Sequence, residues 1–153
     1  MSTLNLPMIV PPKRAWNHGR IIGQKRPLLP KHVWAIRTRL ELEEAFRDLA
    51  LFNMAIDSKL RGCDLVRLKI ADVFAAGTVK ERASILQIKN IMPVRFEITD
   101  GTRNSLSTFI RHPLMAGQDY ILPGRSRKGH HISTRHYARL LKEWFFSIGL
   151  EPD

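Results

Sequence analysis

Apolar residues repeat with helical spacing most clearly near the C-terminal end of the chain. From Ser133 onward they recur every three or four residues, which is the spacing of one face of an α-helix. Ser133 is a suitable N-cap, and Gly149 is a suitable residue for the position after the last turn. The expected buried face consists of Tyr137, Leu140, Leu141, Trp144, Phe145 and Ile148. The pattern predicts an amphipathic helix whose opposite face carries Arg135, Arg139 and Lys142.

Two further helices are predicted closer to the N-terminus, where Pro30 suits a helix entry. The first begins at about Lys31, and its apolar positions are Val33, Trp34, Ile36 and Leu40. The second runs from about Leu42 to Asp57 and is apolar on nearly all sides between Leu49 and Ile56. A helix that lacks a polar face is usually buried. We therefore expect this second helix to lie at the centre of the core.

Two β-strands are predicted in the middle of the chain, at residues 83–89 and 94–99, from their β-branched content and alternation. In the second strand, Val94, Phe96 and Ile98 face one way, whereas Arg95 and Glu97 face the other. Residues 90–93 join the strands as a hairpin. This connection lacks the glycine that tight two-residue turns favour, so a longer or less regular loop is expected.

Shorter features complete the expected α+β fold, which is mainly helical with a small antiparallel β-hairpin or sheet. A short helix is predicted over about Gly62–Leu68, with Cys63 on its apolar side as a buried thiol. Another helix, capped by Asp100 or Thr102, is expected to run to about Arg111, with Leu106, Phe109 and Ile110 facing inward. After it come a short extended piece at residues 120–122 and a basic, glycine-flanked loop at residues 124–131.

The first 29 residues differ from the rest because prolines and glycines interrupt them repeatedly. They predict an extended arm ahead of one domain at residues 30–153. The basic residues of the arm are Lys13, Arg14, Arg20, Lys25 and Arg26. Such an arm can lie along a nucleic-acid backbone or remain a solvated tail. The sequence leaves both interpretations open.

The net charge of the chain narrows the classes of partner that it is expected to bind. The 153 residues contain 25 Lys and Arg against 14 Asp and Glu, a net charge of +11. This excess favours a polyanionic partner over a chain that is merely basic and soluble, because phosphate neutralisation supplies most non-specific nucleic-acid affinity. The single cysteine, Cys63, excludes an intramolecular disulfide and fits a reducing cytoplasm. No apolar run approaches the length of a membrane span, and the N-terminal pattern does not predict a signal peptide.

Arg61 is the first candidate functional residue, at the junction between the apolar helix and the short helix. A guanidinium is always charged and offers a rigid fork of donors, which suits a phosphate. The segment Lys59–Leu65 resembles the tyrosine recombinase (phage integrase) pattern Gly-Leu-Arg-x-x-Glu-Leu, with Asp64 in place of Glu and Lys59 in place of Gly. Residues 51–57 resemble the helix that delivers this arginine in a compact, single-domain subgroup of the family. Alternatively, Arg61 pairs with Asp57 or Asp64 and is only structural.

The resemblance extends from about residue 27 to residue 153 and implies the N-terminal part of an integrase catalytic domain, with a function in DNA integration and site-specific recombination. In that family a lysine on a β-hairpin reaches the scissile phosphate and protonates the leaving 5′-oxygen. Lys89 has that place in this chain, and an ammonium can donate such a proton. The surrounding turn departs from the glycine-containing turn of the family. The alternative is an ordinary exposed lysine at a strand end.

The family pattern continues with a His-x-x-Arg pair at a helix start, a His or Trp, and a nucleophilic tyrosine. The literal match His136–Arg139 is expected to lie inside the last helix, after its first turn, and is not interpreted as the catalytic pair. Tyr120 and Tyr137, the two tyrosines present, lack the position of the nucleophile. The family reaction forms a phosphotyrosyl link without a metal or another cofactor. The resemblance therefore implies a truncated chain that does not cleave DNA strands on its own.

The sequence thus predicts a DNA-binding protein of recombinase type, cytoplasmic and nucleoid-associated, with double-stranded DNA as its partner. Uncovered apolar surface favours self-association or association with a full-length recombinase. One alternative is a non-catalytic module that regulates such a recombinase; another is an unrelated RNA- or DNA-binding protein. His130, His131 and His136 do not predict a metal site, because no Cys or carboxylate stands at ligand spacing. The predicted DNA-contacting residues are Arg61, Lys89, Arg125, Arg127, Lys128, His131, Arg135 and Arg139.

Overall fold

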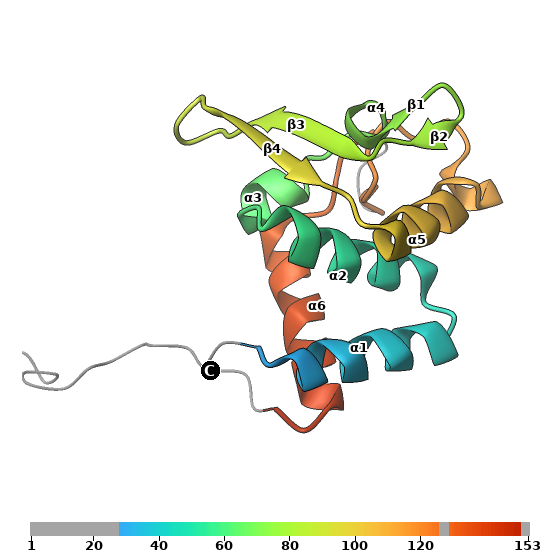
Figure 1. Cartoon of the computed structure of the whole chain (residues 1–153), viewed down its shortest axis with the longest axis vertical. Coiled ribbons are helices and arrows are strands. Elements are labelled where there is room, and N and C mark those ends of the chain that lie inside the picture. Colours follow the sequence, from blue (N-terminus) through green and yellow to red (C-terminus); the bar gives the residue numbers. More distant parts are fainter. Residues whose placement is uncertain (1–27, 126–128, 151–153) are drawn as a thin grey trace, which may run out of the picture.

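The computed structural model describes residues 28–125 and 129–150, and in this part the chain is helix-rich with two small antiparallel sheets (Figure 1). The arm predicted at residues 1–29 lies outside the described residues up to residue 27. The longer helices are α1 (Pro30–Leu42), α2 (Phe46–Ser58), α5 (Asp100–Ile110) and α6 (Thr134–Ser147). The shorter elements are α3 (Gly62–Leu65), α4 (Ile70–Val73), β1 (Phe74–Ala75), β2 (Thr78–Val79), β3 (Arg82–Leu86), β4 (Pro93–Glu97) and the 3₁₀ helix Pro113–Met115. The predicted mainly helical α+β class is confirmed.

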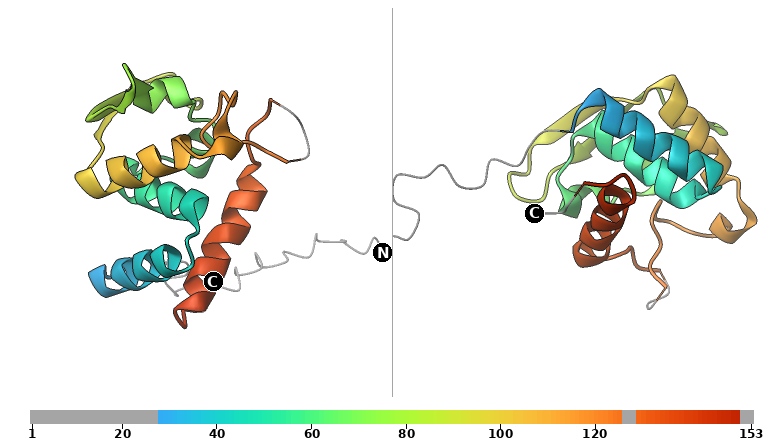
Figure 2. Two further views of the ribbon diagram at one scale, coloured as in Figure 1. Left: turned by 90° about the vertical axis from the view of Figure 1, so that its right-hand side faces the viewer. Right: turned by 90° about the horizontal axis from the view of Figure 1, so that it is seen from below.

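Helix α2 forms the centre of the core, as its apolar sequence predicts. Residues 50–54 are all buried, and α5 and α6 lie on opposite sides of the helix (Figure 2). Phe52 of α2 meets Trp144 of α6 edge to face, with ring centroids 5.6 Å apart. The predicted start at Leu42 is wrong, because α1 continues through Leu42 and α2 begins at Phe46. Glu44 separates the two helices in a left-handed conformation, with φ of 51°.

Helix α1 buries a narrower face than predicted. Ile36 and Leu40 are buried against the core, and Val33 packs partly against it. Trp34, predicted to lie on the same face, is 72% exposed. Ile36 follows Trp34 by two positions, which is about 200° around an α-helix, so the two side chains point in nearly opposite directions.

The predicted hairpin is present as β3 and β4, which pair antiparallel with Ala83 opposite Phe96. Phe96 and Ile98 are buried, Val94 is half-buried, and Arg95 and Glu97 are exposed. The first strand ends at Leu86, earlier than predicted, so Lys89 lies in the connecting loop. The backbone N–H of Gln87 donates to Met92 O across the loop at 3.1 Å. Ile91 supplies the left-handed residue of the turn, with φ of 50°, where a glycine is usual.

Helix α5 confirms the predicted segment but not its cap. Its N-cap is Thr99, one residue before Asp100, and the backbone N–H of Thr99 donates a hydrogen bond to the carboxylate of Asp57 near the end of α2. The predicted inward residues Leu106 and Phe109 are buried, and Ile110 is partly buried.

Helix α6 matches its sequence pattern closely. Ser133 caps it by accepting a hydrogen bond from His136 N at 3.1 Å, and Gly149 follows it with φ of 82°. Leu140 and Trp144 are buried. The other predicted inward residues are partly buried: Tyr137, Leu141, Phe145 and Ile148. Arg135, Arg139 and Lys142 are exposed, as predicted.

Candidate nucleic-acid interface

Arg61 lies where the chain turns from α2 into α3. Helix α2 ends because Lys59 adopts the left-handed conformation, with φ of 53°. Arg61 is then the N-cap of α3, and its carbonyl accepts backbone hydrogen bonds from Asp64 at 3.0 Å and Leu65 at 2.9 Å. Two hydrogen bonds therefore fix the backbone of Arg61, while the residue itself is exposed to solvent.

The two carboxylates that would make Arg61 a purely structural residue have other partners. Asp57 Oδ2 accepts from the backbone N–H of Thr99 at 2.9 Å and from its hydroxyl at 2.8 Å. Asp64 is buried, and its Oδ1 accepts from the backbone N–H of Ile88 at 3.2 Å. Within residues 28–125 and 129–150, Arg61 forms no ion pair. Its charge is therefore free to meet an external anion.

The hydrogen bond between Asp64 and Ile88 ties α3 to the loop of the β3–β4 hairpin. Asp64 follows Arg61 by three residues, and Ile88 immediately precedes Lys89. Figure 1 shows α3 on the underside of this hairpin. Lys89 is exposed in the loop. The Asp64 side chain thus ties the segment after Arg61 to the backbone just before Lys89, a contact that sequence reasoning missed. The position of Asp64 in the Arg61 segment was the available signal.

Exposed cations surround these two positions along the chain. Lys59, Arg67 and Arg95 are exposed, and none of them forms an ion pair in the described part of the chain. Exposed cations without an ion-pair partner attract phosphate groups, since each contact releases a condensed counterion from the nucleic acid.

The other predicted DNA-contacting residues fall into three groups. Arg125, Arg135 and Arg139 are exposed, whereas Arg127 and Lys128 lie outside the described residues. His131 is half-buried: its ring packs edge-on against Tyr120 at 5.2 Å, and its Nδ1 lies 2.6 Å from the carbonyl oxygen of Ile132. Those contacts give His131 a packing role in addition to any contact with DNA.

Both tyrosines are part of the packing. Tyr137 is half-buried, and one of its ring carbons lies 3.2 Å from the point where a Cβ on Gly62 would be. Gly62 therefore allows α6 to approach α3 directly beside Arg61. Burial raises the pKa of Tyr137, which disfavours the phenolate form of this side chain. The ring of Tyr120 contacts His131 on one side, and the Lys69 ammonium lies 5.8 Å from its centroid.

The placement of His136 after the first turn of its helix is wrong. Ser133 caps α6 directly, so His136 is the third helical residue and belongs to the first turn. Burial, followed by the positive charges of Arg47 and Arg139, lowers the pKa of His136. The imidazole is therefore mainly neutral at pH 7. The inward orientation predicted for the neighbouring Tyr137 agrees with its contact to Gly62.

The described residues contain neither a candidate metal site nor a candidate membrane-spanning helix. Within 28–125 and 129–150 there is no group of three or more His, Cys, Asp or Glu side chains that could hold a metal ion. Among the described helices, none is long and apolar enough to cross a membrane. Cys63, expected to be buried, is half-buried and free.

Comparisons with known proteins identify the fold. No protein-family model and no curated protein matches the sequence. Among solved structures, the chain is similar to the one described as "Crystal structure of XerA recombinase", with a TM-score of 0.70 and 14% sequence identity. The match covers 86% of this chain and 46% of the XerA chain, so this chain spans just under half of that protein. At this identity the similarity shows that the chain has a fold of recombinase type.

Proposed function

We propose that this chain binds double-stranded DNA and that Arg61 and Lys89 contact its phosphates side by side. The observation that carries the proposal is the hydrogen bond from Ile88 N to Asp64, which holds the hairpin loop against α3. With that bond in place, the exposed, unpaired Arg61 and the exposed Lys89 belong to one supported unit. The fold shared with XerA recombinase supports DNA as the partner rather than another polyanion.

The two cations suit different parts of a phosphate site. The planar guanidinium of Arg61 can donate two parallel hydrogen bonds to one phosphate. The ammonium of Lys89 is a compact charge on a flexible stem, so it can follow a backbone that varies in position. Phosphate contacts position a protein on DNA without reading its sequence. The proposed function is thus backbone binding that tolerates many sequences.

We propose that the chain does not cut DNA strands by itself. Tyr120 and Tyr137 are its two tyrosines, and both are engaged in packing. An enzyme whose catalytic residues act as one unit loses nearly all of its activity when one of those residues is missing. Incubation with duplex DNA is expected to give no covalent protein–DNA adduct on a denaturing gel.

The proposed contacts predict the effects of single substitutions on DNA affinity. Arg61→Ala and Lys89→Ala are each expected to weaken binding to a labelled duplex by about tenfold at low salt, because each removes a charge-assisted hydrogen bond worth about 1.5 kcal/mol. Fluorescence anisotropy measures the affinity. Lys31→Ala, at an exposed residue in the first turn of α1, is the matched control and should change it less than twofold. Equal losses in all three variants would refute a defined phosphate site.

The hairpin loop also supports the predicted association with another chain. Leu86, Ile91 and Met92 are large, apolar and exposed beside Lys89. Exposed apolar groups of this kind are typical of interaction surfaces. We propose that the loop contacts a second chain of recombinase fold, either a copy of this one or a longer relative. Sedimentation is expected to show that the wild type forms dimers and that an Ile91→Ser, Met92→Ser double variant is monomeric. A wild type that is monomeric and does not bind a longer recombinase either would exclude the proposal.

A further inference from the structure

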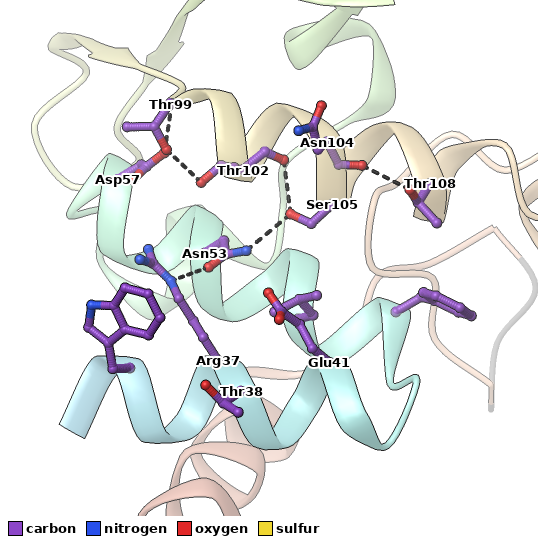
Figure 3. Close-up of a pocket in the computed structure, with 14 residues that line it drawn as sticks. Arg37, Thr38, Glu41, Asn53, Asp57, Thr99, Thr102, Asn104, Ser105 and Thr108 are labelled. Atoms are coloured by element: carbon purple, nitrogen blue, oxygen red, sulfur yellow. Dashed lines mark hydrogen bonds between the residues drawn. The ribbon is translucent and has the colours of Figure 1, made fainter. Parts of the chain in front are cut away.

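A groove of about 800 Å³ lies between α1 and α5 (Figure 3). Helix α2 forms its floor, since both α1 and α5 pack on that helix. Trp34, Arg37 and Glu41 line the α1 wall, one helical turn apart. Such a volume is in the range of sites that hold a ligand or a peptide segment.

A polar network fixes the floor of the groove. The Nε of Arg37 donates to Asn53 Oδ1 at 2.6 Å, and Asn53 Nδ2 donates to Ser105 Oγ at 3.2 Å. The Ser105 hydroxyl donates in turn to Thr102 O at 2.9 Å. Asn53 is only 5% exposed, so α1, α2 and α5 are joined through a buried amide. Figure 3 shows the guanidinium of Arg37 beside Asn53, joined to it by a dashed line. Its terminal nitrogens have no hydrogen-bond partner within the described residues, so they can donate to backbone carbonyls of an occupant.

The rim combines exposed aromatic rings with a carboxylate. Trp34 is 72% exposed and Phe46 is 38% exposed. Glu41 is exposed and forms no ion pair in the part of the chain that the structure describes. Aromatic-lined grooves bind extended proline-rich segments, whose low conformational freedom reduces the entropic cost of binding. An acidic group on such a rim favours a basic residue within the segment.

The chain itself contains a segment of this chemistry. Residues 6–14 read Leu-Pro-Met-Ile-Val-Pro-Pro-Lys-Arg, which combines three prolines, apolar side chains and two adjacent cations. No Asp or Glu precedes Glu41 in the sequence, so the whole N-terminal segment is complementary in charge to that carboxylate. The chemistry of the segment and of the rim therefore match.

The length of the connecting chain permits docking within one molecule. Residues 15–27 separate the segment from Leu28, where the described structure begins just ahead of α1. Such a connection can extend to roughly 40 Å. The α1 wall of the groove reaches about 16 Å beyond Pro30 at its far end. The connecting residues are therefore long enough for the segment to fold back along α1 and reach Glu41.

We propose that residues 6–14 dock into the groove between α1 and α5 of their own chain, with the prolines against Trp34 and Phe46 and with Lys13 or Arg14 beside Glu41. The backbone carbonyls of the segment accept hydrogen bonds from Arg37. The proposal is independent of the proposed DNA-binding function, and the result that supports it is obtained without nucleic acid.

Cysteine pairs in the full chain test the docking. In a Cys63→Ser background, Ile9→Cys is combined with Thr38→Cys in the groove or with the matched Thr78→Cys at the exposed first residue of β2. In a glutathione redox buffer at low protein concentration, the groove pair is expected to form its intramolecular disulfide about tenfold faster, because docking raises the local concentration. Glu41→Lys should reduce that rate to the rate of the control pair, whereas Glu81→Lys, at another exposed glutamate, should not.

Each other outcome overturns the proposal. Equal rates for the two pairs would mean that the segment has no preference for the groove. Disulfides formed only between two molecules would assign the groove to a segment of a second copy. If the pair in the groove forms its disulfide slowly and a Lys13→Ala, Arg14→Ala variant also binds duplex DNA more weakly, the segment binds DNA and not the groove. Circular dichroism before oxidation establishes that every variant is folded.

Discussion

Replacing Asp64 with alanine is expected to lower the free energy of unfolding by about 1.5–3 kcal/mol and to remove the contribution of Lys89 to DNA binding. The buried carboxylate accepts a hydrogen bond from the backbone N–H of Ile88 at 3.2 Å, and in the alanine variant this N–H has lost its charged partner. The hairpin loop then loses its tie to α3. Urea denaturation measures the change in stability, and fluorescence anisotropy with a labelled duplex measures the affinity.

A double-mutant comparison separates anchoring from a general loss of stability. In the Asp64→Ala background, the further change Lys89→Ala is expected to have little additional effect on affinity, because the lysine is already misplaced. Asp64→Asn retains an acceptor oxygen and should lose less on both measurements. If Lys89→Ala weakens DNA binding equally in both backgrounds, Asp64 does not position the lysine.

Phe52→Ala is expected to destabilise the fold by about 3–5 kcal/mol, which is a large part of the stability of an ordinary domain. Phe52 is 1% exposed at the centre of α2, and its ring meets Trp144 edge to face. The substitution opens a cavity between α2 and α6 and removes this aromatic contact. Thermal and urea unfolding both measure the loss.

Phe146→Ala is the matched control for this core prediction. Phe146 lies on α6 two residues beyond Trp144, but it is 74% exposed. Its removal should change the free energy of unfolding by no more than about 0.5 kcal/mol, as surface substitutions usually do. Similar effects of the two substitutions would mean that α2 is not the centre of the core.

The elements that were predicted well are those in which periodicity and burial agree over several turns. Helix α6 has its cap at Ser133 and its apolar stripe where the sequence places them. Helix α2 is buried because its run of apolar residues leaves no polar face. Trp34 shows the limit of the pattern: an apolar residue in a helix was assigned to the inner face although its angular position opposes Ile36.

The remaining elements depend on contacts that periodicity does not encode. Helix α4 and strands β1 and β2 have two to four residues each, which is too short for either periodic pattern. The N-cap of α5 depends on Asp57, which reaches Thr99 across 42 positions of sequence. Similarly, the resemblance singled out Arg61 and Lys89 only as candidates, and the hydrogen bond between Asp64 and Ile88, which spans 24 positions, became apparent only in three dimensions.

The salt dependence of duplex binding tests the proposed phosphate site most directly. The wild type is compared with the double variant Arg61→Ala, Lys89→Ala and with a charge-matched double variant, Lys31→Ala, Arg111→Ala. The two control residues are exposed, one on α1 and one just after α5. A plot of log affinity against log salt is expected to lose about two units of slope in the first variant, about 0.9 for each phosphate contact, and little in the control. Equal slopes in the two double variants would contradict the site and would leave only the general attraction of a basic chain for DNA.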